Sequence, residues 1–182
     1  MSKSGFMIHF IRNKDNKAIN ELKCILSQYS LDQNSVYESE FNFSKLLNVN
    51  KQPIIKLLKS YTCKMLVSCD KIDNELLNHI YNSTFQSIQK VIPLELVIVY
   101  KLSIIKSFLK TKTKLINEND TFKIECKLLK CNKVSRKEEL FELIFSLFNN
   151  KVNLTTPDFV ITIQSIENVI GVSLIDKNNK LI

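Results

Sequence analysis

Glycine, arginine and tryptophan are scarce in this sequence of 182 residues, which contains two glycines, two arginines and no tryptophan. A G-x-G-x-x-G or G-K-[ST] loop needs glycines at fixed spacing, because the backbone must approach a bound phosphate closely. Gly5 and Gly171 are too far apart to contribute to one such loop. The scarcity of glycine therefore argues against a Rossmann-type methyltransferase or NAD site, and we expect no cofactor.

Metal ligands are also sparse. The five cysteines form no C-x-x-C pair and stand at Cys24, Cys63, Cys69, Cys126 and Cys131, while the two histidines, His9 and His79, are far apart. A zinc site needs about four convergent ligands, usually with close pairs. We therefore expect no metal and mostly buried, reduced thiols, as in intracellular proteins. A weaker metal or redox alternative stays open for Cys126 and Cys131.

Candidate catalytic groups are few. Glu138, Glu139 and Glu142 form an acidic group in a predicted helix. Paired carboxylates can perform acid–base catalysis, but a solvated helix face explains these three more simply. The sequence thus predicts a protein that is not an enzyme.

Long apolar runs are absent, since no run approaches the roughly 20 residues that a membrane span needs. The N-terminus leads directly into the strand-like segment GFMIHFI and lacks the features of a signal peptide. We expect no membrane partner and an intracellular, cytoplasmic location, with a nuclear or nucleolar pool if the source is eukaryotic.

Positive charge is in excess, and lysine supplies nearly all of it. The formal net charge is +8; residues 1–90 hold 12 basic and 8 acidic residues and residues 91–182 hold 14 and 10, which leaves +4 in each half. A spread-out lysine excess suits a polyanionic partner bound through its phosphates. A lysine-rich, AT-biased genome would give the same composition, so charge alone leaves both explanations open.

Hydrophobic residues make up 45% of the chain, which predicts a globular protein with a real core. Their spacing switches between periods of two and about 3.6, so strands and helices intermix. The expected order is strand 5–11, helix 15–29, strand 36–43, a short helix from Pro53, strand 64–69, helix 72–89, strand 94–100, a helix from 102, strand 122–129, a helix opening at Ser135 and a closing hairpin. This intermixing predicts an α/β (α+β) sandwich.

The closing hairpin has polar residues at its tip. Phe159, Ile161 and Ile163 alternate onto one face, Glu167 and Asn168 reverse the chain, and residues 169–175 return it. Glycine within a strand marks a bulge or a close approach of another group. We expect Gly171 to have one of these structural roles.

The segment from Cys126 to Lys137 is rich in cations. It contains Lys127, Lys130, Lys133, Arg136 and Lys137 and no acidic residue. Ser135 begins an S-x-x-E capping box, which predicts the start of a helix there and places Arg136 in its first turn. Cations are mildly unfavourable at that end, whereas a bound phosphate would be favourable. We favour phosphate binding over a merely lysine-rich surface loop, and expect that truncating these side chains removes no buried group.

The last hundred residues resemble the THUMP domain, an RNA-binding module of tRNA-modifying proteins. The motifs that carry the resemblance are Phe122-Lys123-Ile124-Glu125, Ser135-Arg136, Val152-Asn153-Leu154, Pro157-Asp158, the strand 159–163 and Gly171-Val172-Ser173. Two positions depart from the family pattern. Thr156 stands where asparagine is usual, and Lys130 stands where the family tends to have arginine.

The residues before this region are similar to the ferredoxin-like domain that accompanies THUMP. Gly5-Phe6, Glu21-Leu22 and Val91-Ile92-Pro93 carry this weaker likeness. The resemblance implies an N-terminal ferredoxin-like domain over residues 1–72 packed on a THUMP domain over 73–182, with mixed sheet and helices. The boundary falls somewhere within 69–91.

The resemblance also implies a function. A chain of this kind is similar to stand-alone tRNA-binding adaptors, which grip the acceptor stem and 3′ CCA end and present a D-arm cytidine to a separate tRNA cytidine acetyltransferase. The implied RNA-binding residues are Lys127, Lys130, Asn132, Lys133, Arg136 and Lys137, and the implied structural residues are Phe122, Ser135, Pro157, Asp158 and Gly171. Two alternatives stay open: a general RNA-binding or ribosome-associated protein, and a small enzyme with an unrecognised site.

Overall fold

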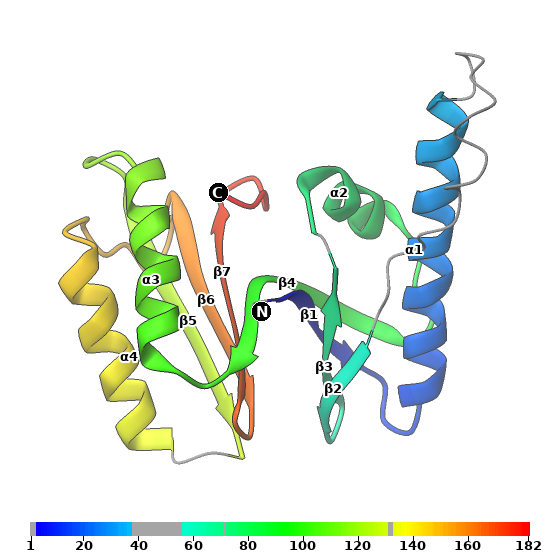
Figure 1. Cartoon of the computed structure of the whole chain (residues 1–182), viewed down its shortest axis with the longest axis horizontal. Coiled ribbons are helices and arrows are strands. Elements are labelled where there is room, and N and C mark those ends of the chain that lie inside the picture. The colour runs from blue at the N-terminus through cyan, green and yellow to red at the C-terminus, as the bar shows by residue number, and fades with distance from the viewer. Residues whose placement is uncertain (1–2, 38–55, 71, 131–132) are drawn as a thin grey trace.

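The computed structural model describes residues 3–37, 56–70, 72–130 and 133–182 (Figure 1). In these ranges, seven strands form one sheet in the order β2-β3-β1-β4-β7-β6-β5. Neighbouring strands are antiparallel except β5 and β6, which are parallel. The predicted mixture of strands and helices is confirmed.

The first half of the chain supplies one end of the sheet and two helices. Its elements are β1 (Lys3–Phe10), α1 (Asp15–Tyr37), β2 (Lys56–Tyr61), β3 (Lys64–Cys69) and α2 (Asn74–Asn82). The expected inner face of α1 is confirmed, because Leu22 and Leu26 are buried and Ile19 and Tyr29 pack beside them.

The second half supplies the other end of the sheet. Its elements are β4 (Ile88–Val99), α3 (Leu102–Lys112), the short 3₁₀ helix η2 (Thr113–Leu115), β5 (Phe122–Leu129), α4 (Lys133–Leu147), β6 (Phe159–Ile166) and β7 (Val169–Asp176). The predicted hairpin is confirmed as β6 and β7, with Glu167 in the left-handed region at φ 58°.

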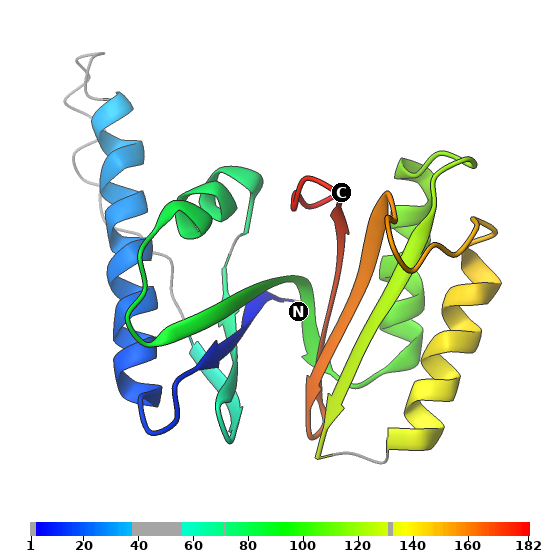
Figure 2. The ribbon, with the colours of Figure 1, turned by 180° about the vertical axis from the view of Figure 1, so that it is seen from behind.

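Helix α1 lies on one outer side of the molecule and helices α3 and α4 on the other, with the sheet between them. Figures 1 and 2 show α1 and α2 at one side, α3 and α4 at the opposite side, and β4 running from one half of the sheet to the other. Each helix pair covers its own apolar core, one centred on Phe6 and Leu22 and the other on Phe122 and Ile144. The opposite, helix-free faces of the two halves therefore face each other.

A third apolar cluster joins the halves on these helix-free faces. Its buried members are Met7, Leu66, Ile92, Leu94, Val97, Ile166 and Val169, with Leu58 and Leu129 packed against them. We call this set the central apolar cluster. It draws residues from both ends of the sheet, so the halves are held together by buried apolar contacts.

The expected short helix after Pro53 is wrong over the described residues, where Lys56–Tyr61 form β2. This strand pairs with β3 across a turn in which Thr62 has a φ of 53°. A short apolar run fits either period, and strand pairing decided it here. The prediction of a strand over 36–43 is wrong at Val36 and Tyr37, because α1 continues through these two residues. The other residues of the predicted strand lie outside the described ranges.

The helix expected over 72–89 ends early, at Asn82. Asp73 caps its start, with Asp73 Oδ1 accepting from Leu76 N at 2.9 Å, and Ser83 ends it in an extended conformation. Ile88, expected on that helix, begins β4 instead, and β4 continues through Pro93. Proline has no N–H to donate to a neighbouring strand. It is tolerated there because the backbone of Pro93 faces β7, with which β4 begins to pair only at Leu96. Pro93 O accepts instead from Ser173 Oγ at 2.7 Å.

Gly171 lies in β7 at a close approach. A Cβ atom added to it would be 2.3 Å from Leu94 Cδ1, and Leu94 is fully buried. Both ladders run through Gly171 without a shift in register. Of the two expected structural roles, close packing is therefore the one that the structure shows.

The boundary between the expected domains, at 72/73, stays a prediction. The core that contains Phe6 and Leu22 also includes Leu76, Leu77 and Ile80 of α2. Helix α2 thus packs with elements that precede it in the chain.

Candidate functional site

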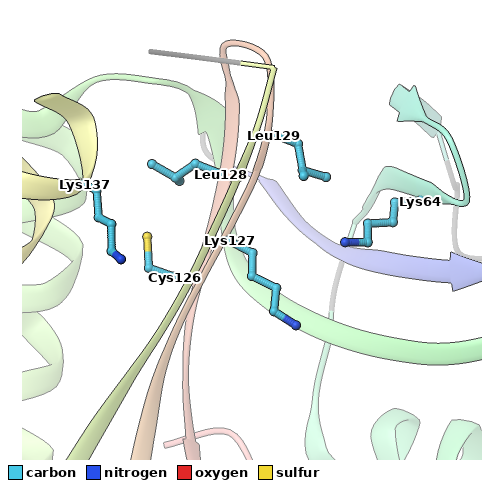
Figure 3. Close-up of a pocket in the computed structure, with 6 residues that line it drawn as sticks. All are labelled: Lys64, Cys126, Lys127, Leu128, Leu129 and Lys137. Atoms are coloured by element: carbon cyan, nitrogen blue, oxygen red, sulfur yellow. The ribbon is translucent and has the colours of Figure 1, made fainter. Parts of the chain in front are cut away.

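Basic side chains gather where the helix-free faces of the two halves meet. Lys127 is on the face of β5 opposite α3 and α4, two residues from Leu129 of the central apolar cluster. Lys64 of β3 lies across from it, and Figure 3 shows the two side chains in the space between β5 and the first half. Both line a pocket of about 290 Å³ together with Cys126, Leu128, Leu129 and Lys137.

A row of three basic residues crosses the first half of the sheet beside this pocket. His9 of β1 pairs in register with Lys64 of β3 on one side and with Lys90 of β4 on the other. Cross-strand partners point to the same face of a sheet, with Cβ atoms about 5 Å apart. We call Lys64, His9, Lys90 and Lys127 the basic cluster.

The basic cluster is electrostatically strained. Burial and, to a smaller extent, the positive charges of Lys64, Lys127 and Lys90 together lower the pKa of His9 from its ordinary 6.5 to about 4. His9 Nε2 is enclosed and has no hydrogen-bond partner among the residues that the structure describes. The imidazole is therefore neutral at physiological pH.

The lysines of the basic cluster lack counter-charges among the described residues. Within the described ranges, neither Lys64 nor Lys90 nor Lys127 has a carboxylate oxygen within 4.0 Å. Other lysines are paired, such as Lys59 with Glu167 at 2.8 Å and Lys123 with Glu125 at 3.1 Å. Uncompensated like charges at close range are unfavourable, and a bound anion would relieve them.

A larger cleft continues from the basic cluster between α2 and the helix-free face of β5, β6 and β7. Its volume is about 590 Å³, and its lining includes Tyr81, Lys90, Glu125, Thr162 and Asp176. Tyr81 is 44% exposed. The cleft offers a polar and partly aromatic surface next to the cations.

The structure places the six residues of the predicted RNA-binding set in different surroundings. Lys127 and Lys137 line the same pocket, although Figure 3 shows Lys137 on the α4 side of β5. Lys130 has a φ of 51°, and its Nζ lies 4.7 Å from the centre of the Tyr61 ring. Asn132 lies outside the described residues, and Lys133 is the first residue of α4.

Arg136 is committed to contacts within the molecule. Its Nη1 donates to Glu167 O at 3.0 Å, and its guanidinium lies 4.6 Å from the centre of the Tyr100 ring. The expectation that its truncation removes no buried group stays a prediction, but the half-buried side chain ties α4 to the β6–β7 turn, so truncation would remove a contact within the molecule. The helix also begins at Lys133, so Ser135 is inside its first turn and is not its N-cap.

Two residues of the predicted structural set hold the β5–β6 region together. Phe122 is fully buried and stacks on Phe159 with ring centres 5.8 Å apart. Asp158, which follows Pro157, accepts from Thr121 N at 3.0 Å and from Thr121 Oγ1 at 2.9 Å. The hydrogen bonds from Thr121 lower the pKa of the Asp158 carboxyl.

His9, Lys64 and Lys90 were missed by sequence reasoning. They are widely separated along the chain from Lys127 and from the cation-rich segment. Their only signal is shared with Lys127: each stands two residues from a member of the central apolar cluster on its own strand. That signal can be read only when the strand register is known.

No group of three or more histidine, cysteine, aspartate or glutamate side chains suited to a metal ion occurs in the described part of the chain. In that part, Cys24 and Cys63 are free thiols. Across the same residues, no helix has the length and apolarity that crossing a membrane requires.

The sequence of residues 105–175 matches the family model described as the THUMP domain. That range runs from within α3 to the penultimate residue of β7 and includes Lys127, Lys130, Arg136 and Lys137. The chain thus contains a THUMP domain, in agreement with the resemblance seen in the sequence. No curated protein matches the chain.

Several solved structures are similar to this chain. The crystal structure of PH1313 from Pyrococcus horikoshii is 13% identical with a TM-score of 0.56, covering 95% of this chain and 55% of that one. A 4-thiouridine synthetase–RNA complex with bound ATP is 16% identical (TM-score 0.46; 96% and 42% covered), and TrmN from Thermus thermophilus is 7% identical (TM-score 0.45; 94% and 45% covered). The chain spans about half the length of these proteins.

Proposed function

We propose that this chain, which contains a THUMP domain, binds tRNA and serves as a non-catalytic adaptor in tRNA modification. THUMP domains are RNA-binding modules of tRNA-modifying proteins, as the resemblance in the sequence implies. The observation that carries the proposal is the basic cluster, in which three lysines without carboxylate partners in the described structure face one another across the two halves. RNA phosphates supply the negative charge that these lysines lack.

The shape of the surface supports RNA more than a small anion. Lys64 and Lys127 lie on opposite walls of one pocket, and the larger cleft beside them exposes Tyr81. Exposed aromatic rings next to cations suit the stacked bases and phosphates of unpaired nucleotides. The 3′ CCA end of tRNA is such a segment, and we propose that it and the acceptor stem lie along this surface.

The adaptor role is the finer part of the proposal. The chain would present a D-arm cytidine to a separate tRNA cytidine acetyltransferase, which performs the 4-acetylcytidine chemistry. The motif resemblance supports this role, and the scarcity of glycine leaves no loop of the usual kind for a nucleotide cofactor in this sequence.

Incubation of the purified protein with whole tRNA, acetyl-CoA and ATP tests both tRNA binding and the adaptor role. We expect salt-dependent binding of tRNA, weaker binding of the same tRNA without its CCA end, and no 4-acetylcytidine by mass spectrometry. Acetylation by the pure protein alone would overturn the adaptor role. A deletion strain gives the cellular test: selective loss of 4-acetylcytidine from tRNAs supports the adaptor, whereas unchanged modification with enrichment of ribosomal RNA on the protein favours a general RNA-binding function.

A further inference from the structure

The basic cluster is a continuation of the central apolar cluster along four strands. Met7, Leu66, Ile92 and Leu129 belong to the central apolar cluster. Two residues away on the same strands and the same face stand His9, Lys64, Lys90 and Lys127, respectively. The apolar contact between the halves thus ends in a ring of basic groups contributed by β1, β3, β4 and β5.

Among the residues that the structure describes, the charged groups that act on His9 are all cationic. Lys64 comes from β3, Lys90 from β4 and Lys127 from β5, and their charges act on the imidazole together with its burial. The nearest acidic residue of β5, Glu125, lies on the same face but is paired with Lys123 at 3.1 Å. The His9 imidazole therefore stays unprotonated for as long as no anion is bound between the lysines.

We propose that the basic cluster binds a phosphodiester group of RNA between Lys64, Lys90 and Lys127, and that His9 takes up a proton when this phosphate is bound. The inference rests on the proposed RNA-binding function and adds a specific phosphate site and a proton-linked affinity to it. A phosphate between the three ammonium groups offsets their field, which together with burial keeps the imidazole neutral, and its own negative charge favours the imidazolium. His9 then becomes a fourth cation at the site, where its charge is favourable.

The linkage has a definite sign and size. A proton taken up on binding makes the RNA affinity increase as the pH falls. If bound RNA returns the pKa of His9 from about 4 to its ordinary 6.5, the affinity at about pH 5.5 exceeds that at about pH 7.5 by roughly tenfold. Protonation contributes almost nothing above neutral pH, so the site then works through its lysines alone.

The test measures the affinity for an acceptor-stem minihelix with a CCA end at several pH values and constant salt. Wild-type protein should bind the minihelix roughly tenfold more tightly at about pH 5.5 than at about pH 7.5, and His9→Gln should gain less than about twofold over the same range. His79→Gln is the matched histidine control and should keep the full pH dependence. Lys64→Gln should weaken binding, whereas Lys106→Gln, on the exposed face of α3, should not.

Direct titration of His9 by NMR keeps the test independent of any variant. Saturating minihelix should raise the pKa of His9 in wild-type protein, and inorganic phosphate at the same concentration should not. A His9 pKa that stays low in the RNA complex, or a full pH dependence in His9→Gln, overturns the inference and leaves RNA binding intact. An equal effect of inorganic phosphate overturns the assignment to RNA. A lack of RNA binding at every pH overturns this inference and the proposed function together.

Discussion

At the scale of single residues, several side chains hold the end of the molecule where β5, α4 and the β6–β7 turn meet. Arg136 bonds the Glu167 carbonyl and lies on Tyr100, whose hydroxyl donates to Glu139 Oε2 at 2.7 Å. Lys59 bonds the Glu167 carboxylate, and the hydrogen bond and charge of Lys59 lower the pKa of Glu167. The turn between β6 and β7 is thus held from both halves.

Arg136→Ala should lower the free energy of unfolding by about 1–2 kcal/mol, because it removes a charged hydrogen bond and a cation–π contact. Arg136→Lys keeps the charge and loses the planar fork, so it should fall between wild type and Arg136→Ala. Urea unfolding measures both variants. The exposed Lys137→Ala is the control, and an Arg136→Ala midpoint equal to the control would contradict the structural role.

Gly171→Val should destabilise the fold by about 1–3 kcal/mol, since the new side chain overlaps the fully buried Leu94. A thermal melt measures the loss. Shortening the neighbour should make room, so Leu94→Ala combined with Gly171→Val should cost less than the sum of the two single variants. An unchanged melting temperature with loss of tRNA binding would show that Gly171 acts at the RNA surface.

Stability should fall as the pH is lowered through the range in which His9 is protonated only in the unfolded chain. The folded pKa of about 4 is below the ordinary 6.5, so the unfolded state binds more protons between these values. We expect a loss of about 1–2 kcal/mol from this group across that range, after allowing for partial exposure to solvent. The urea midpoint of His9→Gln should change less with pH over the same range than that of wild type. Parallel plots of midpoint against pH for the two proteins would contradict the expectation. Below it, Asp158 and Glu167, whose pKa values are lowered, lose their contribution as they protonate.

At the scale of elements, apolar packing and an ion pair both join the two halves, and their contributions to stability are unequal. Leu66 and Met7 are fully buried in the central apolar cluster, whereas the side chains of Lys59 and Glu167 are 38% and 39% exposed. Exposed ion pairs contribute little and are screened by salt. Burial of apolar surface contributes more per residue.

Leu66→Ala should therefore cost about 2–5 kcal/mol, as expected for a buried leucine that leaves a cavity. Lys59→Met should barely move the urea midpoint, and its small effect should vanish at high salt. Leu57→Ala on β2 is the control for Leu66→Ala, because Leu57 is 45% exposed. A larger loss from Lys59→Met than from Leu66→Ala would show that charge pairs hold the halves together.

At the scale of the whole molecule, the distribution of uncompensated lysines should determine the salt dependence of RNA binding. Replacing Lys64 and Lys127 by glutamine should weaken all tRNAs similarly, because lysine contacts phosphates and carries little information about bases. Each lost contact should reduce the slope of log affinity against log salt by roughly 0.7–0.9. The matched control replaces Lys106 and Lys110 of α3, which are exposed on the outer side of the molecule.

Filter-binding titrations across a salt series measure these slopes. A triple alanine variant of Lys130, Lys133 and Arg136 tests the remaining part of the predicted RNA-binding set, with tRNA lacking CCA as the second ligand. If the double glutamine variant binds like wild type while the triple variant does not, the RNA lies along α4 and the turn before it, and the basic cluster is not its site.

The sequence by itself determined the elements with strong periodicity. The buried faces of α1, α3 and α4, the closing hairpin and the central strand followed from apolar spacing, and the motifs of the second half identified the THUMP domain. These features are local, because a helix face or an alternating strand is encoded within about 10 neighbouring residues. The scarcity of glycine likewise needed no structure to argue against a nucleotide loop.

Tertiary structure decided the features that depend on pairing between distant segments. Lys56–Tyr61 became a strand through its ladder with β3, and Ile88 joined β4 through its pairing with Phe10 of β1. The basic cluster has the same origin. Residues 9, 64, 90 and 127 share no pattern that can be read without the strand register, and only the register of β1, β3 and β4 and the approach of β5 bring their charges together. Pairwise electrostatics depend on distance in space, which the order of residues along the chain does not specify.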